Sequence, residues 1–486
     1  MFFSPAALLR ILLPVILVQS AVWSNQRAGH AREFAAPAGP SVRKPNFVII
    51  LVDDMGWADI GLNGSRFYQT PHIDQLAARG MQFKQAYAAA PVCSPTRAAL
   101  LTGQYPARLQ ITDWLPGRPD QPSQKLKRAF LKKELPLEET TLAEVLKSNG
   151  YRTAHIGKWH LGEEDHGPLQ QGFDVNIGGD ESGSPASYFY PYANEANPAW
   201  RIPGLTGGRP NEYLTDRLTT EAEGFMEQNR HQPFLLYLAH YAVHIPMKAK
   251  EELIKKYAGL AKPGAAQHNA IYAAMIQSVD ESVGRMIKKL QQLQLDNNTV
   301  LIFTSDNGGL SVEEGPHTPA TSNAPLRAGK GYLYEGGLRV PLLMCIPGRK
   351  GGLISNEPVS SVDMYPTILG LAGIRQGTEK KVDGKSLLPL WNGHTLQPRN
   401  LYWHYPHYSN QGGKPGWAIR QGDYKLIRFF EEGKIELYNV QTDPGEQKNL
   451  AEKLPQKAVA LQRALVVWGK KTGAQFMRPN PEYKGR

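Results

Sequence analysis

Residues 46–54 read NFVIILVDD, a run dominated by large apolar residues that ends in two aspartates. The run lacks the alternation of polar and apolar positions, which is typical of a strand buried on both faces of a parallel sheet. Residues 299–307 repeat the arrangement as TVLIFTSDN. Two further apolar runs follow the same pattern: one ends in GKWH at residues 157–160, and the other leads to His240 and His244. This repeated pattern, an apolar run and then a polar cluster, predicts four strands of one sheet.

Helical patterns lie between these runs. Residues 141–147 place apolar side chains at helical spacing, and Asn149-Gly150 after them is a stop signal. Residues 271–293 carry a long apolar row on one helical face. Strands that alternate with helices predict an α/β domain with a central, mostly parallel sheet flanked by helices. After about Gly377 short alternating runs predict a smaller antiparallel sheet, closed by a helix near residues 456–468.

The first residues resemble an export signal. Arg10 precedes a short apolar run at residues 11–18, with small residues after it. An uncleaved anchor is the alternative, although the run is shorter than the roughly 20 apolar residues that a membrane span needs. The sequence therefore predicts an exported protein without a stable membrane span, in the periplasm, the medium or a lysosomal-type compartment. The predicted segments are a signal peptide (1–24), a linker (25–44), a main domain (45–375) and a C-terminal subdomain (376–486).

Composition narrows the function classes. The chain has 486 residues, a formal net charge of +11 and two cysteines, Cys93 and Cys345. Two cysteines cannot form a disulfide framework, although they could form one bridge. A basic chain can bind nucleic acid, but the only dense basic block, KLKRAFLKK at 125–133, has no aromatic-interleaved binding motif around it. We therefore expect no nucleic-acid partner, and interpret the charge as a solvated surface or as a field for small anionic substrates.

The polar clusters predict a metal site. In open α/β sheets, ligands collect at the carboxyl ends of the strands. Asp53, Asp54, Asp306 and Asn307 would meet there and offer only oxygen ligands. Ca²⁺ and Mg²⁺ prefer such a set, whereas Zn²⁺ prefers histidine or cysteine. The alternative is that these residues only end strands and start turns, as Asp often does.

One cysteine stands in an unusual setting. Residues 91–103 read PVCSPTRAALLTG, and Pro95 fits the first turn of a helix that begins near Cys93. The helix dipole and Arg97 make this position electropositive. The residues alone leave two interpretations open, an activated thiolate and a small buried cysteine.

The same stretch resembles a family signature. CSPTR followed by AALLTG is similar to the sulfatase signature C-x-P-x-R-x-x-x-x-T-G, and GYRTAHIGKWHLG at 150–162 resembles the second signature of that family. Further similar segments are NFVIILVDDMGW (46–57), TPHIDQLAARG (70–80), HYAVHIP (240–246), TSDNG (304–308) and LRAGKGYLYEGGLRVP (326–341). The chain is thus similar to the type I, formylglycine-dependent sulfatases, which include arylsulfatases and belong to the alkaline phosphatase superfamily. The resemblance implies an alkaline-phosphatase-like fold and the hydrolysis of sulfate esters.

The resemblance also implies a role for individual residues. The metal, usually Ca²⁺ and less often Mg²⁺, would be held by Asp53, Asp54, residue 93, Asp306 and Asn307. Catalysis and sulfate binding would fall to Cys93, Arg97, Lys158, His160, His244 and Lys330. Cys93 would be oxidised to formylglycine (3-oxoalanine) by a formylglycine-generating enzyme, a maturation partner. His240 stays open between an orienting role and a merely buried one.

The family mechanism gives these residues an order of action. A hydroxyl of hydrated formylglycine would attack the sulfur, a step of nucleophilic catalysis, and Arg97 would steady the hydrate. Lys158, His244 and Lys330 would contact the sulfate, and His244 or Lys330 would protonate the departing oxygen. His160 would then act as the base that releases sulfate.

Two alternatives to a sulfatase remain at this point. One is a phosphate or phosphonate ester hydrolase of the same superfamily, and the other is a non-catalytic module that binds sulfated glycans. The substrate is expected to be a sulfated sugar or polysaccharide, and its alcohol part to face loops at 112–137, 176–211 and 310–327. Tyr188, Phe189 and Tyr190 in the second loop would either stack on a sugar or pack under the loop.

Overall fold

A computed structural model describes residues 43–262, 264–375, 377 and 380–484. The predicted signal peptide and nearly all of the predicted linker lie outside the described residues. Within the described part of the chain, no helix combines the length and the apolar character that crossing a bilayer requires.

The centre of the unit Lys44–Arg486 is an eight-stranded mixed sheet. Its strand order is β10-β2-β9-β8-β1-β7-β5-β6. The bounds are β1 Asn46–Val52, β2 Met81–Phe83, β5 Arg152–Gly157, β6 Val175–Ile177, β7 Phe234–Ala239, β8 Thr299–Ser305, β9 Leu342–Cys345 and β10 Leu353–Ser355. All pairs are parallel except those of β9, which runs antiparallel to β8 and β2. The four strands predicted from their apolar runs are the adjacent β8, β1, β7 and β5, which confirms the expected sheet.

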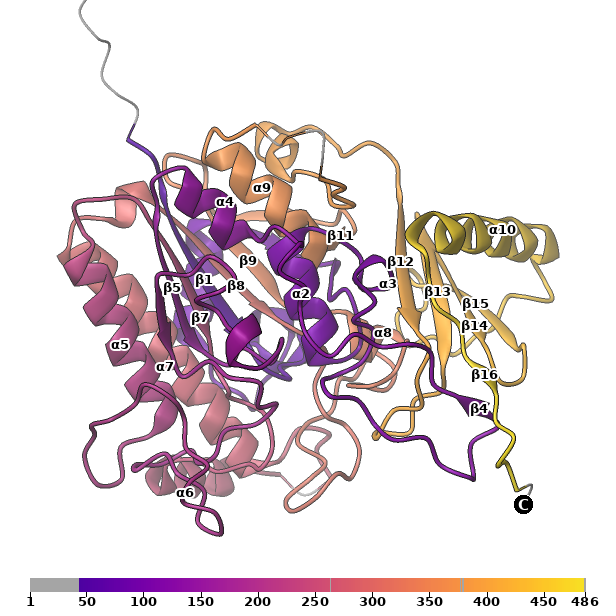
Figure 1. The fold of residues 1–486 in the computed structure, drawn as a ribbon, viewed down its shortest axis with the longest axis horizontal. Coiled ribbons are helices and arrows are strands. Elements are labelled where there is room, and N and C mark those ends of the chain that lie inside the picture. The colour runs from indigo at the N-terminus through magenta and orange to yellow at the C-terminus, as the bar shows by residue number, and fades with distance from the viewer. Residues whose placement is uncertain (1–42, 263, 376, 378–379, 485–486) are drawn as a thin grey trace, which may run out of the picture. The chain divides into compact units, whose positions relative to one another are not determined.

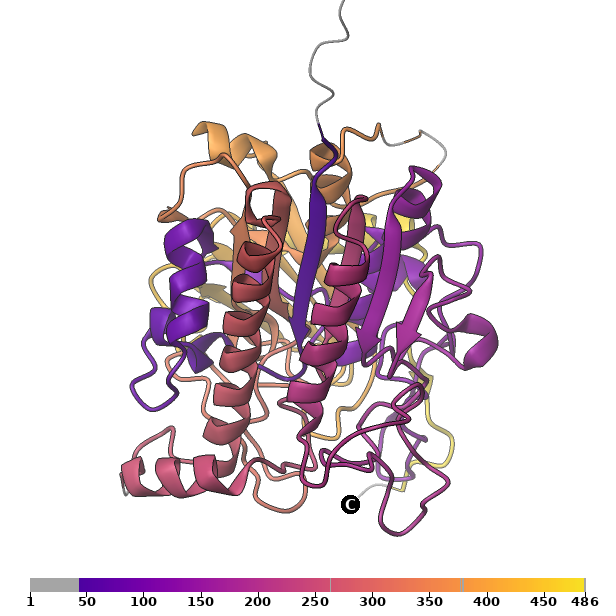
Figure 2. The ribbon, with the colours of Figure 1, turned by 90° about the vertical axis from the view of Figure 1, so that its left-hand side faces the viewer.

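Helices cover both faces of this sheet (Figure 1). Figure 2 looks onto the face covered by α1 (Pro71–Arg79), α5 (Leu214–Gln228) and α7 (Ala270–Gln292). The opposite face carries α2 (Cys93–Thr102), α4 (Leu142–Ser148) and α9 (Met364–Leu371). Because helices bury the sheet from both sides, every residue of β1 and β8 is buried, as their unbroken apolar runs predict.

Local sequence explains where two of these helices begin. Thr141 caps α4, because its hydroxyl accepts from the amide of Glu144 while the Glu144 carboxylate accepts from the amide of Thr141. The side chain of Asn269 accepts from two amides at the start of α7. The predicted helices at 141–147 and 271–293 are therefore confirmed to within one residue at each end.

A second, smaller sheet occupies the C-terminal region. It is antiparallel with the order β12 (Asn400–Tyr405), β13 (Gly416–Gln421), β14 (Tyr424–Phe429) and β15 (Ile435–Asn439). Helix α10 (Pro455–Thr472) packs on it through an apolar face that includes Leu461 and Leu465. The predicted antiparallel sheet with a closing helix is confirmed, whereas a domain boundary at residue 375 stays a prediction.

Short elements complete the fold. The remaining helices are α3 (Pro106–Leu109), α6 (Glu251–Leu260) and α8 (Glu335–Leu338). Two strand pairs lie apart from the main sheets, β3 (Ala86–Tyr87) with β11 (Val359–Ser360) and β4 (Leu126–Lys127) with β16 (Arg478–Pro479).

Candidate active site

The polar clusters meet at one edge of the main sheet. β5, β7, β1 and β8 are parallel neighbours, so their carboxyl ends lie side by side. The backbone stays in register beyond the strands, since the amide of Asp53 donates to the carbonyl of Ala242 at 2.9 Å and that of Lys158 to the carbonyl of Ala239 at 2.8 Å. This edge is the position at which ligands bind in open α/β sheets.

Each buried carboxylate at this edge faces a buried lysine or arginine side chain. Asp53 Oδ2 accepts from Lys158 Nζ at 2.6 Å, and Asp54 Oδ2 accepts from Lys330 Nζ at 2.7 Å. Asp306 Oδ2 accepts from both Nε and Nη2 of Arg97, at 2.9 and 2.7 Å. A carboxylate removed from water needs such a partner, because isolated buried charges are costly. The site therefore holds three acidic and three basic side chains in direct contact.

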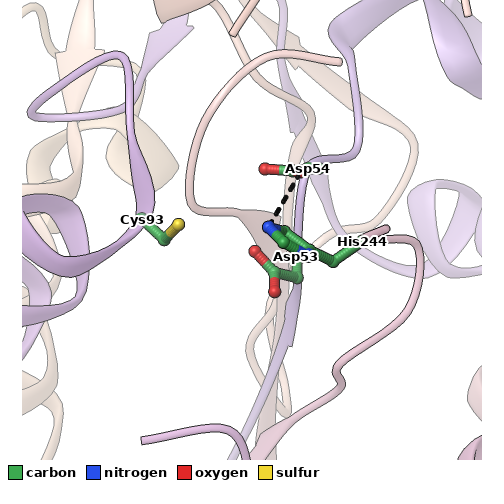
Figure 3. A group of neighbouring side chains, drawn as sticks. All are labelled: Asp53, Asp54, Cys93 and His244. Carbon is green, nitrogen blue, oxygen red and sulfur yellow. Dashed lines mark ion pairs between the residues drawn. The ribbon is translucent and has the colours of Figure 1, made fainter. Parts of the chain in front are cut away.

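The residues present fit a divalent cation. Asp53, Asp54, Cys93 and His244 each offer a ligand atom, and these atoms lie within 4.8 Å of one another (Figure 3). Asp53 Oδ1 and Asn307 Oδ1 are buried oxygens without a hydrogen-bond partner among the described residues. Asp53 Oδ1 lies 3.6 Å from Arg97 Nη2, too far for a hydrogen bond. Buried acceptors that lack a hydrogen bond are what a cation would satisfy.

The other two predicted ligands lie against Asp54. Asn307 Nδ2 donates to Asp54 Oδ1 at 2.7 Å, and Asp306 Oδ1 accepts from the amide of Asp54 at 3.2 Å. The structure thus brings all the predicted ligand residues together and adds His244, whose Nε2 lies 3.6 Å from Asp54 Oδ2. Although burial alone would raise the pKa of Asp54, the Lys330 charge and its hydrogen bond lower it below its usual range.

Cys93 begins helix α2, as predicted, and its side chain points toward the carboxylates (Figure 3). Burial raises the pKa of its thiol to about 11, although the charges of Lys158 and Lys330 oppose this shift. The thiol is therefore neutral near pH 7, which argues against the activated-thiolate interpretation. Cys93 and Cys345 are both free, so the possible bridge between them is not formed.

His244 and Lys330 form a pair beside Asp54. Lys330 Nζ lies 2.9 Å from His244 Nε2, while His244 Nδ1 lies 2.6 Å from the carbonyl of Ile245. Burial and the Lys330 charge hold the pKa of His244 well below its usual value. In the neutral ring these contacts assign the proton to Nδ1 and leave Nε2 as an acceptor of the Lys330 proton.

His160 reaches the site through a strained backbone. Its φ is 59°, in the left-handed region that non-glycine residues seldom adopt, and Asp54 has a similar φ of 60°. Nε2 of His160 lies 2.6 Å from the carbonyl of Leu115, and Nδ1 has no partner among the described residues. Burial, with the nearby Lys158 charge, holds the pKa of His160 well below its usual value. The ring is therefore neutral, and Nδ1 is its unprotonated nitrogen.

His240 and Tyr188, whose roles the sequence leaves open, both make contacts within the fold. His240 is buried and its Nε2 lies 3.0 Å from Ser282 Oγ of α7, a contact that favours the buried interpretation of this histidine. The hydroxyl of Tyr188 donates to the carbonyls of Tyr241 and His244, both at 2.8 Å. Tyr188 thus packs under the loop that carries His244 and does not face a ligand.

A cavity of about 390 Å³ opens at this edge. Its lining contains the predicted residues Cys93, His160, His244 and Lys330. All three loops expected to flank the substrate contribute as well: Trp114, Leu115 and Pro116 from the first, Glu181, Ser182, Gly183 and Ser184 from the second, and Glu314 from the third. The position of these loops around the cavity is therefore confirmed.

Asn410 and Gln411 form a fourth part of the lining, which the sequence does not predict. They lie in the turn between β12 and β13, which is part of the smaller sheet, and they line the cavity. The local sequence SNQGG at 409–413 signals a turn, but nothing in it indicates contact with the distant main sheet.

Sequence profiles, curated relatives and solved structures that are similar to this chain indicate the same family. The sequence profile "Sulfatase" matches residues 45–374, and the profile "N-sulphoglucosamine sulphohydrolase, C-terminal" matches residues 328–467. The chain is 34% identical to N-acetylgalactosamine-6-sulfatase of Mus musculus over 432 residues, covering 84% of this chain and 77% of the mouse protein. It is 30% identical to a sulfatase of Formosa agariphila, covering 85% of each chain. Among solved structures, Ps i-CgsB in complex with k-i-k-neocarrahexaose is similar with a TM-score of 0.75 and 30% identity, covering 88% of this chain and 93% of that one.

Proposed function

The chain belongs to the sulfatase family, and from this premise we propose that it hydrolyses sulfate esters of sugars at the cavity that contains Cys93. The observation that carries the proposal is the contact of three buried carboxylates with Lys158, Lys330 and Arg97 next to Cys93. These cations can balance the charge on the oxygens of a sulfate group. Sugars are proposed because the mouse relative is named for a sulfated amino sugar and Ps i-CgsB holds an oligosaccharide.

We propose that Asp53, Asp54, Asp306, Asn307 and residue 93 hold a divalent cation, Ca²⁺ before Mg²⁺. The oxygen-rich ligand set and the two unpartnered oxygens support a hard cation. When bound, such a cation would polarise a sulfate oxygen and orient the group. His244, which also lies within this cluster, is assigned to the sulfate because its Nε2 faces Lys330.

Residue 93 is proposed to act as formylglycine and not as a thiol. The raised pKa of Cys93 supports this assignment, since a neutral buried thiol is a poor nucleophile. In hydrated form the aldehyde would supply the hydroxyl that attacks sulfur. Arg97 is held against Asp306 and the carbonyl of Lys158, so its guanidinium is fixed beside that position.

The proton transfers are assigned from the hydrogen bonds. Lys330 lies within hydrogen-bond distance of both Asp54 and His244, so the Lys330–His244 pair is proposed to protonate the departing sugar oxygen. His160 is proposed as the base that releases sulfate, because its Nδ1 is free and its ring is neutral. A formylglycine-generating enzyme and an exported location are proposed with this assignment.

The test compares esters that differ only in the transferred group. Release of inorganic sulfate is measured from N-acetylgalactosamine 6-sulfate, galactose 6-sulfate and 4-nitrophenyl sulfate, and release of phosphate from the matching phosphate esters. We expect faster turnover of the sulfates, and no turnover by Cys93→Ala. Faster turnover of the phosphates would favour the phosphoesterase alternative, and sugar binding without sulfate release would favour the non-catalytic one.

A further inference from the structure

The part of the cavity that must receive the sugar has an acidic character. If the sulfate group contacts Cys93, Lys330 and His244, the alcohol part is left with the side chains that the loops supply. The polar ones are Glu181, Ser182, Ser184, Glu314, Asn410 and Gln411, and they lie beside the largely apolar Trp114, Leu115 and Pro116. No lysine or arginine is among them, so every charged side chain that the loops add to the cavity is a carboxylate.

Glu314 is fixed in place without being neutralised. Its Oε2 accepts from Nε2 of Gln411 and its Oε1 accepts from Nδ2 of Asn410 at 3.3 Å. Its backbone amide donates to the hydroxyl of Thr318 at 2.7 Å. Within the described part of the chain, neither Glu314 nor Glu181 has a basic side chain within 4.0 Å, whereas the lysines of the sulfate end are ion-paired. Carboxamide partners orient a carboxylate but leave its negative charge intact.

The other loops are fixed relative to Cys93. Leu115, next to Trp114, donates its amide to the hydroxyl of Ser94 at 3.1 Å, and Ser94 follows Cys93 directly. The amide of His160 donates to the carbonyl of Asp180 at 2.9 Å, which places Glu181 beside the second signature. The backbone that carries Trp114 and Glu181 is therefore held close to Cys93 and His160, while the Glu314 carboxylate is held by Asn410 and Gln411.

Such a lining distinguishes sugars by their substituents. A carboxylate accepts hydrogen bonds from sugar hydroxyls, and these charge-assisted bonds are strong. A second sulfate or a uronate in the same space would face two unneutralised carboxylates, and like charges brought together across an interface are strongly disfavoured. The cavity volume of about 390 Å³ is near the low end for small-molecule sites, roughly 300–1,000 Å³, so one sugar unit has little room to turn away.

We propose that the carboxylates of Glu314 and Glu181, with Glu314 as the main contributor, make this enzyme selective for sugar units that carry one sulfate and free hydroxyls. Sugar units with a second anionic group are rejected. The inference rests on the proposed function and names the substrate class of the same site. Asn410 and Gln411 act as positioning residues, because they contact Glu314 and hold its carboxylate toward the cavity.

The experiment measures a ratio of two substrates. The value of kcat/KM is determined for N-acetylgalactosamine 6-sulfate and for the 4,6-disulfate of the same sugar. Wild type is compared with Glu314→Gln, and with Glu313→Gln as a matched control, since Glu313 is the exposed neighbour outside the cavity. We expect the preference for the monosulfate to fall at least tenfold in Glu314→Gln and to stay unchanged in Glu313→Gln. Glu181→Gln, at an exposed position, is expected to lower the same preference.

A second readout separates this inference from the proposed function. Turnover of 4-nitrophenyl sulfate by wild type, absent in Cys93→Ala, reports the sulfatase activity itself. Both sugars are also tested as competitive inhibitors of that turnover, so their preference is measured even if neither is cleaved. An equal preference in wild type, Glu314→Gln and Glu313→Gln would overturn the inference while the sulfatase activity stands. Absence of any sulfate release by wild type would overturn the proposed function.

Discussion

The contact between Arg97 and Asp306 gives a prediction whose size follows from the structure. Both side chains are buried, and Arg97 donates two charged hydrogen bonds to a single oxygen of Asp306. Hydrogen bonds to charged groups contribute about 1.5–3 kcal/mol each, and removing one partner of a buried ion pair costs about 3–5 kcal/mol. We therefore expect Arg97→Met to lower the free energy of unfolding by about 4 kcal/mol, because Asp306 would keep an uncompensated charge.

A double-mutant cycle isolates the pair. Asp306→Asn alone is expected to be costly as well, since it leaves the Arg97 charge without its main partner. The double variant removes both charges, so we expect a coupling energy of about 1.5–3 kcal/mol. Unfolding by urea is followed by tryptophan fluorescence in the presence of a chelator, so that no added cation compensates the carboxylates.

A matched cycle at Arg108 and Asp383 is the control. This pair has similar distances, with Arg108 Nη2 2.7 Å from Asp383 Oδ1, but it is partly exposed to solvent. Its coupling is expected to be about 1 kcal/mol or less. If the costs at Arg97 and Asp306 add to within about 0.5 kcal/mol, the two side chains do not stabilise each other and the charge balance described for the site is wrong.

Three further predictions concern protons, the cation and catalysis. Burial raises the pKa of Asp113 to about 7, against about 4 in an unfolded chain. Ionisation of this carboxyl then favours the unfolded chain, so its contribution to stability is complete below about pH 4 and falls by about 4 kcal/mol as the pH rises to 7. Asp113→Asn should flatten this slope in urea unfolding at pH 4 to 8, and an unchanged slope would contradict the assignment. Calcium at 100 times its Kd should raise the free energy of unfolding by about 2.7 kcal/mol. Calorimetry should show that this stabilisation is lost in Asp54→Asn. If the variant is stabilised equally, calcium binds elsewhere. In single-turnover experiments His160→Ala should slow the release of sulfate from the enzyme by about 10²–10⁴-fold and affect the first step less, whereas an unaffected release step would remove His160 from the role of base.

The sequence allowed the grouping of the candidate metal ligands to be predicted because the information there is local. Unbroken apolar runs mark β1 and β8 as buried on both faces, and the residues after two adjacent parallel strands must meet. This is why Asp53, Asp54, Asp306 and Asn307 could be grouped from their positions in the chain alone.

Side-chain direction could not be predicted in the same way. His240 and His244 both follow β7, yet His240 bonds Ser282 of α7 while His244 lies against Lys330. The difference arises from the path of the chain after β7, which the hydrophobic pattern of the sequence does not predict. The resemblance to the family signature was needed to prefer His244.

Contacts between residues that are far apart in the chain could not be predicted from the sequence either. Glu314 and Gln411 are 97 residues apart and lie in loops that follow strands of different sheets, and Thr112 and His407 are 295 residues apart. Turn composition indicates that residues 409–413 form a loop, but only the packing of the two sheets decides which cavity that loop completes.

The mass of the peptide that spans residues 85–97 tests the central claim most directly. It is measured on enzyme that releases sulfate, produced together with a formylglycine-generating enzyme. We expect residue 93 to carry an aldehyde and the aldehyde fraction to rise in proportion to the sulfatase activity. An active enzyme with an unmodified thiol at Cys93 throughout the sample would contradict this expectation.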